Sequence, residues 1–327
     1  SNFSVGGTLT VNGNALLDPS AGVVVSGAGS LTGNGTVRVR GSASFDSQYT
    51  ITGKTLDNLT VEYAGNAAQT LSARTYGNLK INNSNGVTLS GGNATVNGTL
   101  TLSTDLDTSS NTLTMGCSAT SSTTSPGYDV VGNVSRTCTW GNSTWSFGNP
   151  NVSIKFNSGS PPNSITVNLV KSEPSGFGNN AVQRTYTITD ASGFDATLRL
   201  HYRDTELGSN SEGGLTLWRF DGSNWVDKGS SSSNSTDNWV EQNTGITAFS
   251  PWAISGISPT LVKLNSFTAT EYSGGKVLLQ WRTGYEVNNL GFHIYREANG
   301  ERLRLTPELV AGTAFLVGPG TQLTSGH

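Results

Sequence analysis

The sequence NLKINNSNGVTLSGGNATVNGTLTL, residues 78–102, contains the pattern that decides the fold. Its first and last triplets, Leu79-Lys80-Ile81 and Leu100-Thr101-Leu102, begin 21 residues apart, and Leu59-Thr60-Val61 lies 20 residues before the first. Because side chains alternate along a strand, each triplet turns two apolar residues inward and one polar residue outward. A strand this short buries its face only when others stack on it. We therefore predict a parallel β-helix, or solenoid, with about 20 residues per coil.

A second repeat occupies the N-terminal part of the chain. It consists of an apolar residue, any residue, Val, any residue and Gly, at 9–13, 23–27 and 37–41, in steps of 14 residues. Fourteen residues is short for a full coil. We therefore expect the first rungs to be two-sided or hairpin-like, within a repeat domain that spans residues 1–115.

The composition of the chain favours an all-β fold. Gly is abundant at 41 of 327 residues, and no stretch of a dozen residues has apolar positions at helical spacing. Charged residues make up 13%, with 19 Lys and Arg against 22 Asp and Glu. Without a basic stripe, nucleic acid is excluded as a partner. No apolar run approaches the roughly 18 residues that a membrane span requires.

The remainder of the chain divides into two expected parts. Residues 116–257 lose the period and gain aromatic residues, and about eight or nine strand segments separated by turn signals predict a β-sandwich. Within it, Asp221-Gly222-Ser223-Asn224 predicts a hairpin turn. Residues 258–327 predict part of a fibronectin-type or immunoglobulin-like sandwich, with Trp281 and Tyr295 as core positions.

The last part is too short for a whole module. It has 70 residues, whereas such a sandwich needs roughly 100. An open sheet leaves backbone groups unpaired and an apolar face wet. Either further residues of a longer protein complete it, or another chain adds the missing strands, which would give a head-to-tail polymer.

Several segments resemble known bacterial surface proteins. Residues 78–102, 127–134 and 248–252 resemble repeats of large surface proteins of bacteria. Residues 264–292 are similar to a module near the C-terminus of proteins exported by the type IX secretion route, and related modules follow gingipain-like cysteine protease domains. The resemblance implies export, an extracellular, cell-surface or secreted location, and an adhesin-like or envelope role. It carries over no catalytic residue.

The chain contains exactly one pair of cysteines, Cys117 and Cys138. Exported proteins mature in an oxidising space, so we expect these two residues to form a disulfide, worth roughly 3 kcal/mol in the chain-entropy model. The alternative is two buried free thiols.

Candidate binding residues are few, and no catalytic residue is expected. The three histidines show no metal-ligand spacing, and no cofactor is expected, although Asp105 and Asp107 could hold a calcium ion if that segment is extended. The alternative is two solvated turn carboxylates. Most of the seven tryptophans suit core packing. Trp225 and Trp239 flank polar loops and are the preferred candidates for sugar contact.

Two functions of different classes follow. The first is a non-enzymatic structural or adhesive surface protein that binds itself or other surface proteins and assembles into a fibre or envelope layer. The second is the spacer and carbohydrate-binding portion of a larger secreted hydrolase or protease, with polysaccharide as partner.

Overall fold

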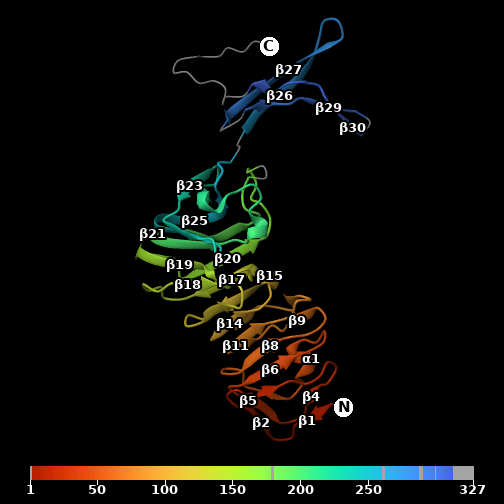
Figure 1. Ribbon diagram of the computed structural model, residues 1–327, viewed down its shortest axis with the longest axis vertical. Coiled ribbons are helices and arrows are strands. Elements are labelled where there is room, and N and C mark those ends of the chain that lie inside the picture. The colour runs from red at the N-terminus through yellow and green to blue at the C-terminus, as the bar shows by residue number, and fades with distance from the viewer. Residues whose placement is uncertain (1, 178–179, 260–261, 287–289, 299, 312–327) are drawn as a thin grey trace.

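The computed structural model describes residues 2–177, 180–259, 262–286, 290–298 and 300–311. These residues form an all-β molecule, as predicted, with a single α-helix of four residues, α1 (Phe45–Gln48). Figure 1 shows the N-terminal coils at one end of an elongated chain and the hairpin of β26 and β27 at the other.

The N-terminal part is a parallel β-solenoid, which confirms the prediction made from the rung triplets. One of its sheets contains six parallel strands, one from each successive coil. Within this sheet Leu79 pairs with Leu100, as the 21-residue step requires. The inward residues of these two rungs are fully buried. The six strands are β3 (Leu16–Leu17), β6 (Thr36–Val39), β8 (Thr60–Tyr63), β11 (Asn78–Ile81), β14 (Thr99–Leu102) and β16 (Thr120–Thr123).

The other sides of the coils form shorter parallel sheets. Tight corners connect them, and a Cβ atom on Gly33, whose φ is 131°, would lie 2.0 Å from the carbonyl oxygen of Val11. The strands of these sides are β1 (Phe3–Ser4) with β4 (Val25–Ser26); β2 (Thr8–Val11) with β5 (Ser30–Gly33) and β7 (Gly53–Lys54); β9 (Gln69–Leu71) with β12 (Val87–Leu89); β10 (Thr75–Tyr76) with β13 (Ala94–Val96); and β15 (Leu106–Met115), which pairs with both β12 and β13.

The first rungs are neither two-sided nor hairpin-like, so that expectation was wrong. Thr8 pairs in parallel with Ser30, and Ser30 pairs with Gly53, which are full coils. The 14-residue repeat instead connects β2, β4 and β6, which belong to three different sheets. A repeated sequence pattern predicts where similar strands lie in the chain, but it does not predict whether those strands belong to the same sheet.

The solenoid continues directly into the sandwich-like part. β17 (Val130–Thr137) pairs in parallel with β15 on one side and antiparallel with β20 (Ser164–Val170) on the other. The predicted boundary after residue 115 therefore falls inside one continuous sheet. A single cluster of buried apolar residues runs from Val5 to Ile254. The two parts share both a sheet and a core.

The antiparallel strands beyond β20 build the second part. β21 (Thr185–His201) pairs with both β19 (Asn149–Gly159) and β25 (Trp239–Ser255). Phe194 of β21 packs against Phe249 of β25, with ring centroids 4.7 Å apart. The turn predicted at 221–224 connects β22 (Thr216–Phe220) to β23 (Trp225–Gly229). The remaining strands are β18 (Trp145–Phe147) and β24 (Ser232–Asn234).

The C-terminal segment forms three two-stranded sheets. They are β26 (Val262–Tyr272) with β27 (Lys276–Glu286), β28 (Gly291–Phe292) with β31 (Val310–Ala311), and β29 (Tyr295–Ala298) with β30 (Glu301–Arg304). None of the side chains whose exposure is described between 262 and 311 is buried. Trp281 and Tyr295, expected as core positions, line an open groove of about 470 Å³. Residues 312–327, part of the predicted module, lie outside the described residues.

Candidate functional site

The main group of buried charges lies where the last coil meets the sandwich. Asp129 is 1% exposed, and Arg184 and His201 are 0% exposed. Arg184 Nη2 donates to Asp129 Oδ2 at 2.7 Å, and its Nε donates to Glu206. His201 Nδ1 lies 2.9 Å from Asp129 Oδ1. We call these four residues the ionic cluster.

The members of the ionic cluster come from both parts of the molecule. Asp129 directly precedes β17, the strand that closes the solenoid. Arg184 and His201 flank or end β21 of the sandwich, and Glu206 belongs to the 3₁₀ turn Asp204–Glu206. The pair of Asp129 and Arg184 therefore ties the last coil to the sandwich.

The charges of the cluster compensate one another. Burial alone would raise the pKa of Asp129, but the Arg184 guanidinium and the His201 hydrogen bond hold that pKa well below its usual range. Burial lowers the pKa of His201, and the contact with Asp129 offsets this only in part. Burial thus favours the neutral imidazole. Ionised Asp129 only accepts hydrogen bonds and so favours a proton on His201 Nδ1, while the Arg184 Nη1 donor lies 3.2 Å from the same nitrogen.

A histidine paired with an aspartate is also the base portion of a nucleophilic triad. Here the free ring nitrogen, His201 Nε2, is buried and has no hydrogen-bond partner among the described residues. The cavity beside Asp129, lined also by Asn149 and Tyr186, is about 10 Å³, room for one water molecule at most. The His201 ring itself has no exposed surface in this structure. The geometry is that of a structural tie between two parts of a fold.

The two carboxylates predicted for calcium have separate partners. Asp105 accepts hydrogen bonds from Lys171 Nζ at 2.7 Å and from Arg203 Nη2, so its charge is already paired with two cations. Asp107 is exposed and accepts a hydrogen bond from Ser109 N at 2.7 Å. The structure therefore does not bring them to one ion. Within the part of the chain that is described, no three His, Cys, Asp or Glu side chains are placed to hold a metal.

Other side chains of the protein pack against both tryptophans that were predicted to contact sugar. Trp225 is only 9% exposed, its ring lies 5.3 Å from that of Phe177, and its Nε1 donates to the Ser175 carbonyl. Trp225 therefore packs inside the sandwich, and little of its ring faces solvent. Trp239 is partly buried, and the Arg199 guanidinium carbon lies 3.8 Å from its ring centroid. Arg199 covers one of its two faces.

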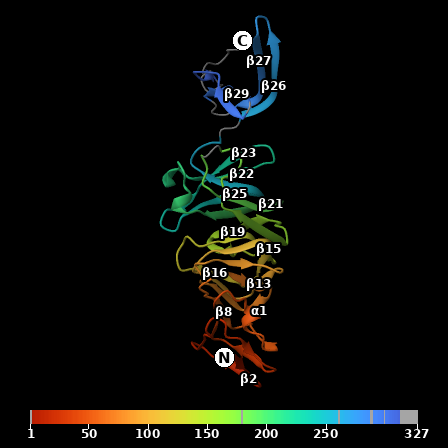
Figure 2. The same ribbon diagram turned by 90° about the vertical axis from the view of Figure 1, so that its right-hand side faces the viewer.

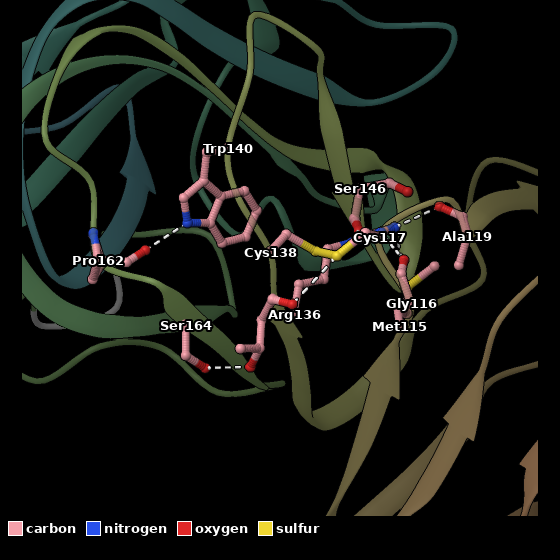
Figure 3. The surroundings of a disulfide bond; sticks show 11 residues. Met115, Gly116, Cys117, Ala119, Arg136, Cys138, Trp140, Ser146, Pro162 and Ser164 are labelled. Atoms are coloured by element: carbon pink, nitrogen blue, oxygen red, sulfur yellow. Dashed lines mark hydrogen bonds between the residues drawn. A yellow bond between two sulfur atoms is a disulfide. The ribbon is translucent and has the colours of Figure 1, made fainter.

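The predicted disulfide between Cys117 and Cys138 is confirmed (Figure 3). It connects the turn after β15 to the residue after β17, with the Cα atoms 5.6 Å apart. The bond therefore fixes the last parallel strand pair of the solenoid at the start of the sandwich.

A buried cation that sequence reasoning missed lies beside the disulfide. Arg136 is 1% exposed, and its guanidinium donates to backbone carbonyls rather than to a carboxylate. Figure 3 shows its guanidinium directed at the turn that carries Cys117, where it donates to the carbonyls of Gly116 and Ala119 at 2.6 and 2.8 Å. Burial lowers its pKa to about 10, so it remains charged at pH 7. Its inward place in the alternation of β17 is the signal that could have revealed it.

Comparison with known proteins identifies no relative: no family model, no curated protein and no solved structure matches the chain. Among the described residues, no helix is long and apolar enough to cross a membrane.

Removing the disulfide should destabilise the junction. In a Cys117→Ser/Cys138→Ser double variant, the unfolded chain regains the freedom of the loop between the two residues, which lowers the free energy of unfolding by about 3 kcal/mol. Urea unfolding followed by tryptophan fluorescence measures this change. The wild type under reducing conditions is the matched control and should show the same loss. An unchanged urea midpoint in both would contradict this assignment.

Removing the central cation of the ionic cluster should cost more than removing a surface one. Arg184→Met removes the fully buried cation between Asp129 and Glu206 and leaves Asp129 with the longer contacts to Lys171 and Arg203, at 3.5 and 3.3 Å, which is expected to cost about 3 kcal/mol. Arg199→Met is the control, since Arg199 pairs with Glu241 at a part-exposed position and should cost at most about 1 kcal/mol. Urea unfolding of both variants tests this. Equal, small losses would show that the ionic cluster does not tie the two parts together.

Proposed function

We propose that this chain is a non-enzymatic, extracellular structural or adhesive protein of the cell surface. The observation that carries the proposal is the buried ionic cluster between the last coil of the solenoid and the sandwich. The one buried histidine–aspartate pair of the described residues faces the interior of the fold and binds the solenoid to the sandwich. A histidine–aspartate pair transfers protons in some enzymes, whereas here it connects two parts of the fold.

The architecture supports a role as a spacer or stalk. Figure 2 shows the coils and the sandwich following one another along the long axis. One core runs through both, and the disulfide and the ionic cluster cross their junction. Because the solenoid and the sandwich share one core, a rod built from these two parts holds its two ends at a fixed distance.

Export and a surface or secreted location belong to the same proposal. A disulfide is typical of oxidising compartments. The resemblance to adhesin-like proteins of the type IX secretion route points the same way. As partners we propose other surface proteins or a second copy of the chain.

A second candidate is the carbohydrate-binding spacer of a larger secreted hydrolase or protease. The observation that favours it is the open groove of the C-terminal segment, where Trp281, Phe292 and Tyr295 line one cavity. Aromatic rings in an open groove can stack on sugar rings. This role would place the sugar contact in the C-terminal segment rather than at Trp225 or Trp239.

Both candidates predict that the chain has no hydrolytic activity of its own. The purified protein, incubated with a panel of polysaccharides and peptides, should release no product above a blank without protein. A His201→Gln variant serves as the control, because it removes the one histidine that is paired with a carboxylate. Turnover by the wild type that this variant abolishes would contradict the proposal.

A further inference from the structure

His201 has a ring nitrogen for which the surrounding fold provides no hydrogen-bond partner. Its side chain has no exposed surface, and Nε2 is unpaired within the part of the chain that the structure describes. The other nitrogen, Nδ1, lies 2.9 Å from Asp129 Oδ1 and 3.2 Å from Arg184 Nη1. A charged imidazole carries a proton on both nitrogens. Charging His201 in place therefore buries an N–H donor without an acceptor, which costs free energy.

The charged side chains packed around this ring already balance one another. Burial is the largest effect on His201 and lowers its pKa, while Asp129 favours the charged ring and Arg184 opposes it. Around the ring three carboxylates pair with three cations, so a proton on His201 would add an unbalanced charge. The carboxylates are Asp105, Asp129 and Glu206, and the cations are Lys171, Arg184 and Arg203.

The neighbouring strands β19, β21 and β25 place uncharged side chains beside this ring. Asn149 of β19 contributes an amide nitrogen 3.5 Å from Nδ1, and Trp239 of β25 pairs with His201 in the sheet. The Tyr186 hydroxyl on β21 donates to the His201 carbonyl at 2.7 Å, and burial raises the pKa of Tyr186, so it stays uncharged. These groups therefore leave no free anion for a second proton on His201.

The hydrogen bond of His201 crosses the junction between the two parts of the fold. Asp129 directly precedes β17, which closes the solenoid, whereas His201 ends β21 of the sandwich. A change in the charge of this ring therefore acts at the place where solenoid and sandwich meet.

We propose that His201 makes the junction between solenoid and sandwich sensitive to mild acid. The folded protein keeps the ring uncharged, and the ring takes up a second proton only when the junction opens. In an unfolded chain an imidazole takes up that proton near pH 6.5. Below about this pH the open state binds more protons than the closed one, so the stability of the junction falls as the pH falls. The full stability is present above about pH 6.5.

The carboxylate of the pair does not contribute to this pH dependence. Although burial raises the pKa of Asp129, Arg184 and His201 hold it well below its usual range, so Asp129 stays ionised in mild acid. Carboxylates of the unfolded chain protonate near pH 4. The interval between about pH 6.5 and 5 therefore reports on histidine. The inference goes beyond the structural role, because it names a condition, neutral pH, under which the two parts are held most firmly.

Urea unfolding of the full chain between about pH 7.5 and 5 tests the inference. For the wild type, the equilibrium constant of unfolding should rise by up to about tenfold for each pH unit below about 6.5, the effect of one proton taken up. His201→Gln keeps a hydrogen-bonding side chain but cannot titrate, so it should lose that dependence. His293→Gln is the matched control, because His293 is partly exposed in the C-terminal segment and should leave the wild-type dependence unchanged.

The ionisation of His201 in the folded protein gives a second readout that needs no variant. In NMR spectra of nitrogen-labelled wild type, the His201 ring should keep the chemical shifts of a neutral imidazole down to about pH 5.5, well below its ordinary midpoint. Three results would each overturn the inference: a folded His201 that titrates at or above about pH 6.5, a stability unchanged across the interval, or a pH dependence that His201→Gln retains. None of them bears on the non-enzymatic role, which turnover alone contradicts.

Discussion

Everything in this fold depends on the stacking of strands too short to be stable alone. A rung such as Leu79-Lys80-Ile81 buries two apolar side chains only because equivalent rungs lie above and below it. The last strand of such a stack would have an unpaired edge. At the C-terminal end this edge is closed, because β17 pairs in parallel with β15 on one side and antiparallel with β20 on the other. The sandwich is thereby the cap of the solenoid.

The polar chemistry of the interior serves the same closure. Asp129 and Arg184 pair across the junction, and Arg136 and the disulfide hold the turn that follows β15. The three charged side chains and the disulfide each connect one part of the chain to another. We therefore expect the solenoid and the sandwich to unfold as one cooperative unit.

The sequence predicted features that are repeated or unique. The rung triplets recur every 20 to 21 residues, and each of the two cysteines can pair only with the other. Features that depend on distant contacts were missed: Asp129 and Arg184 lie 55 residues apart with no shared pattern. The burial of Trp225 was not foreseen either, because polar loops next to a residue do not reveal which way its ring points. Nothing in the sequence indicated that Asp105 pairs with Lys171 and Arg203, because these cations lie just after β20 and β21, far from Asp105 along the chain.

Native-state hydrogen exchange tests the cooperative unit most directly. Amides of β11 and β14 in the solenoid and of β21 and β25 in the sandwich can be followed in rising, sub-denaturing concentrations of urea. If one core and one junction bind the two parts, the slowest amides of all four strands should open with the same free energy and the same urea dependence. Two separate free energies, with the solenoid opening while the sandwich remains protected or the reverse, would contradict the account.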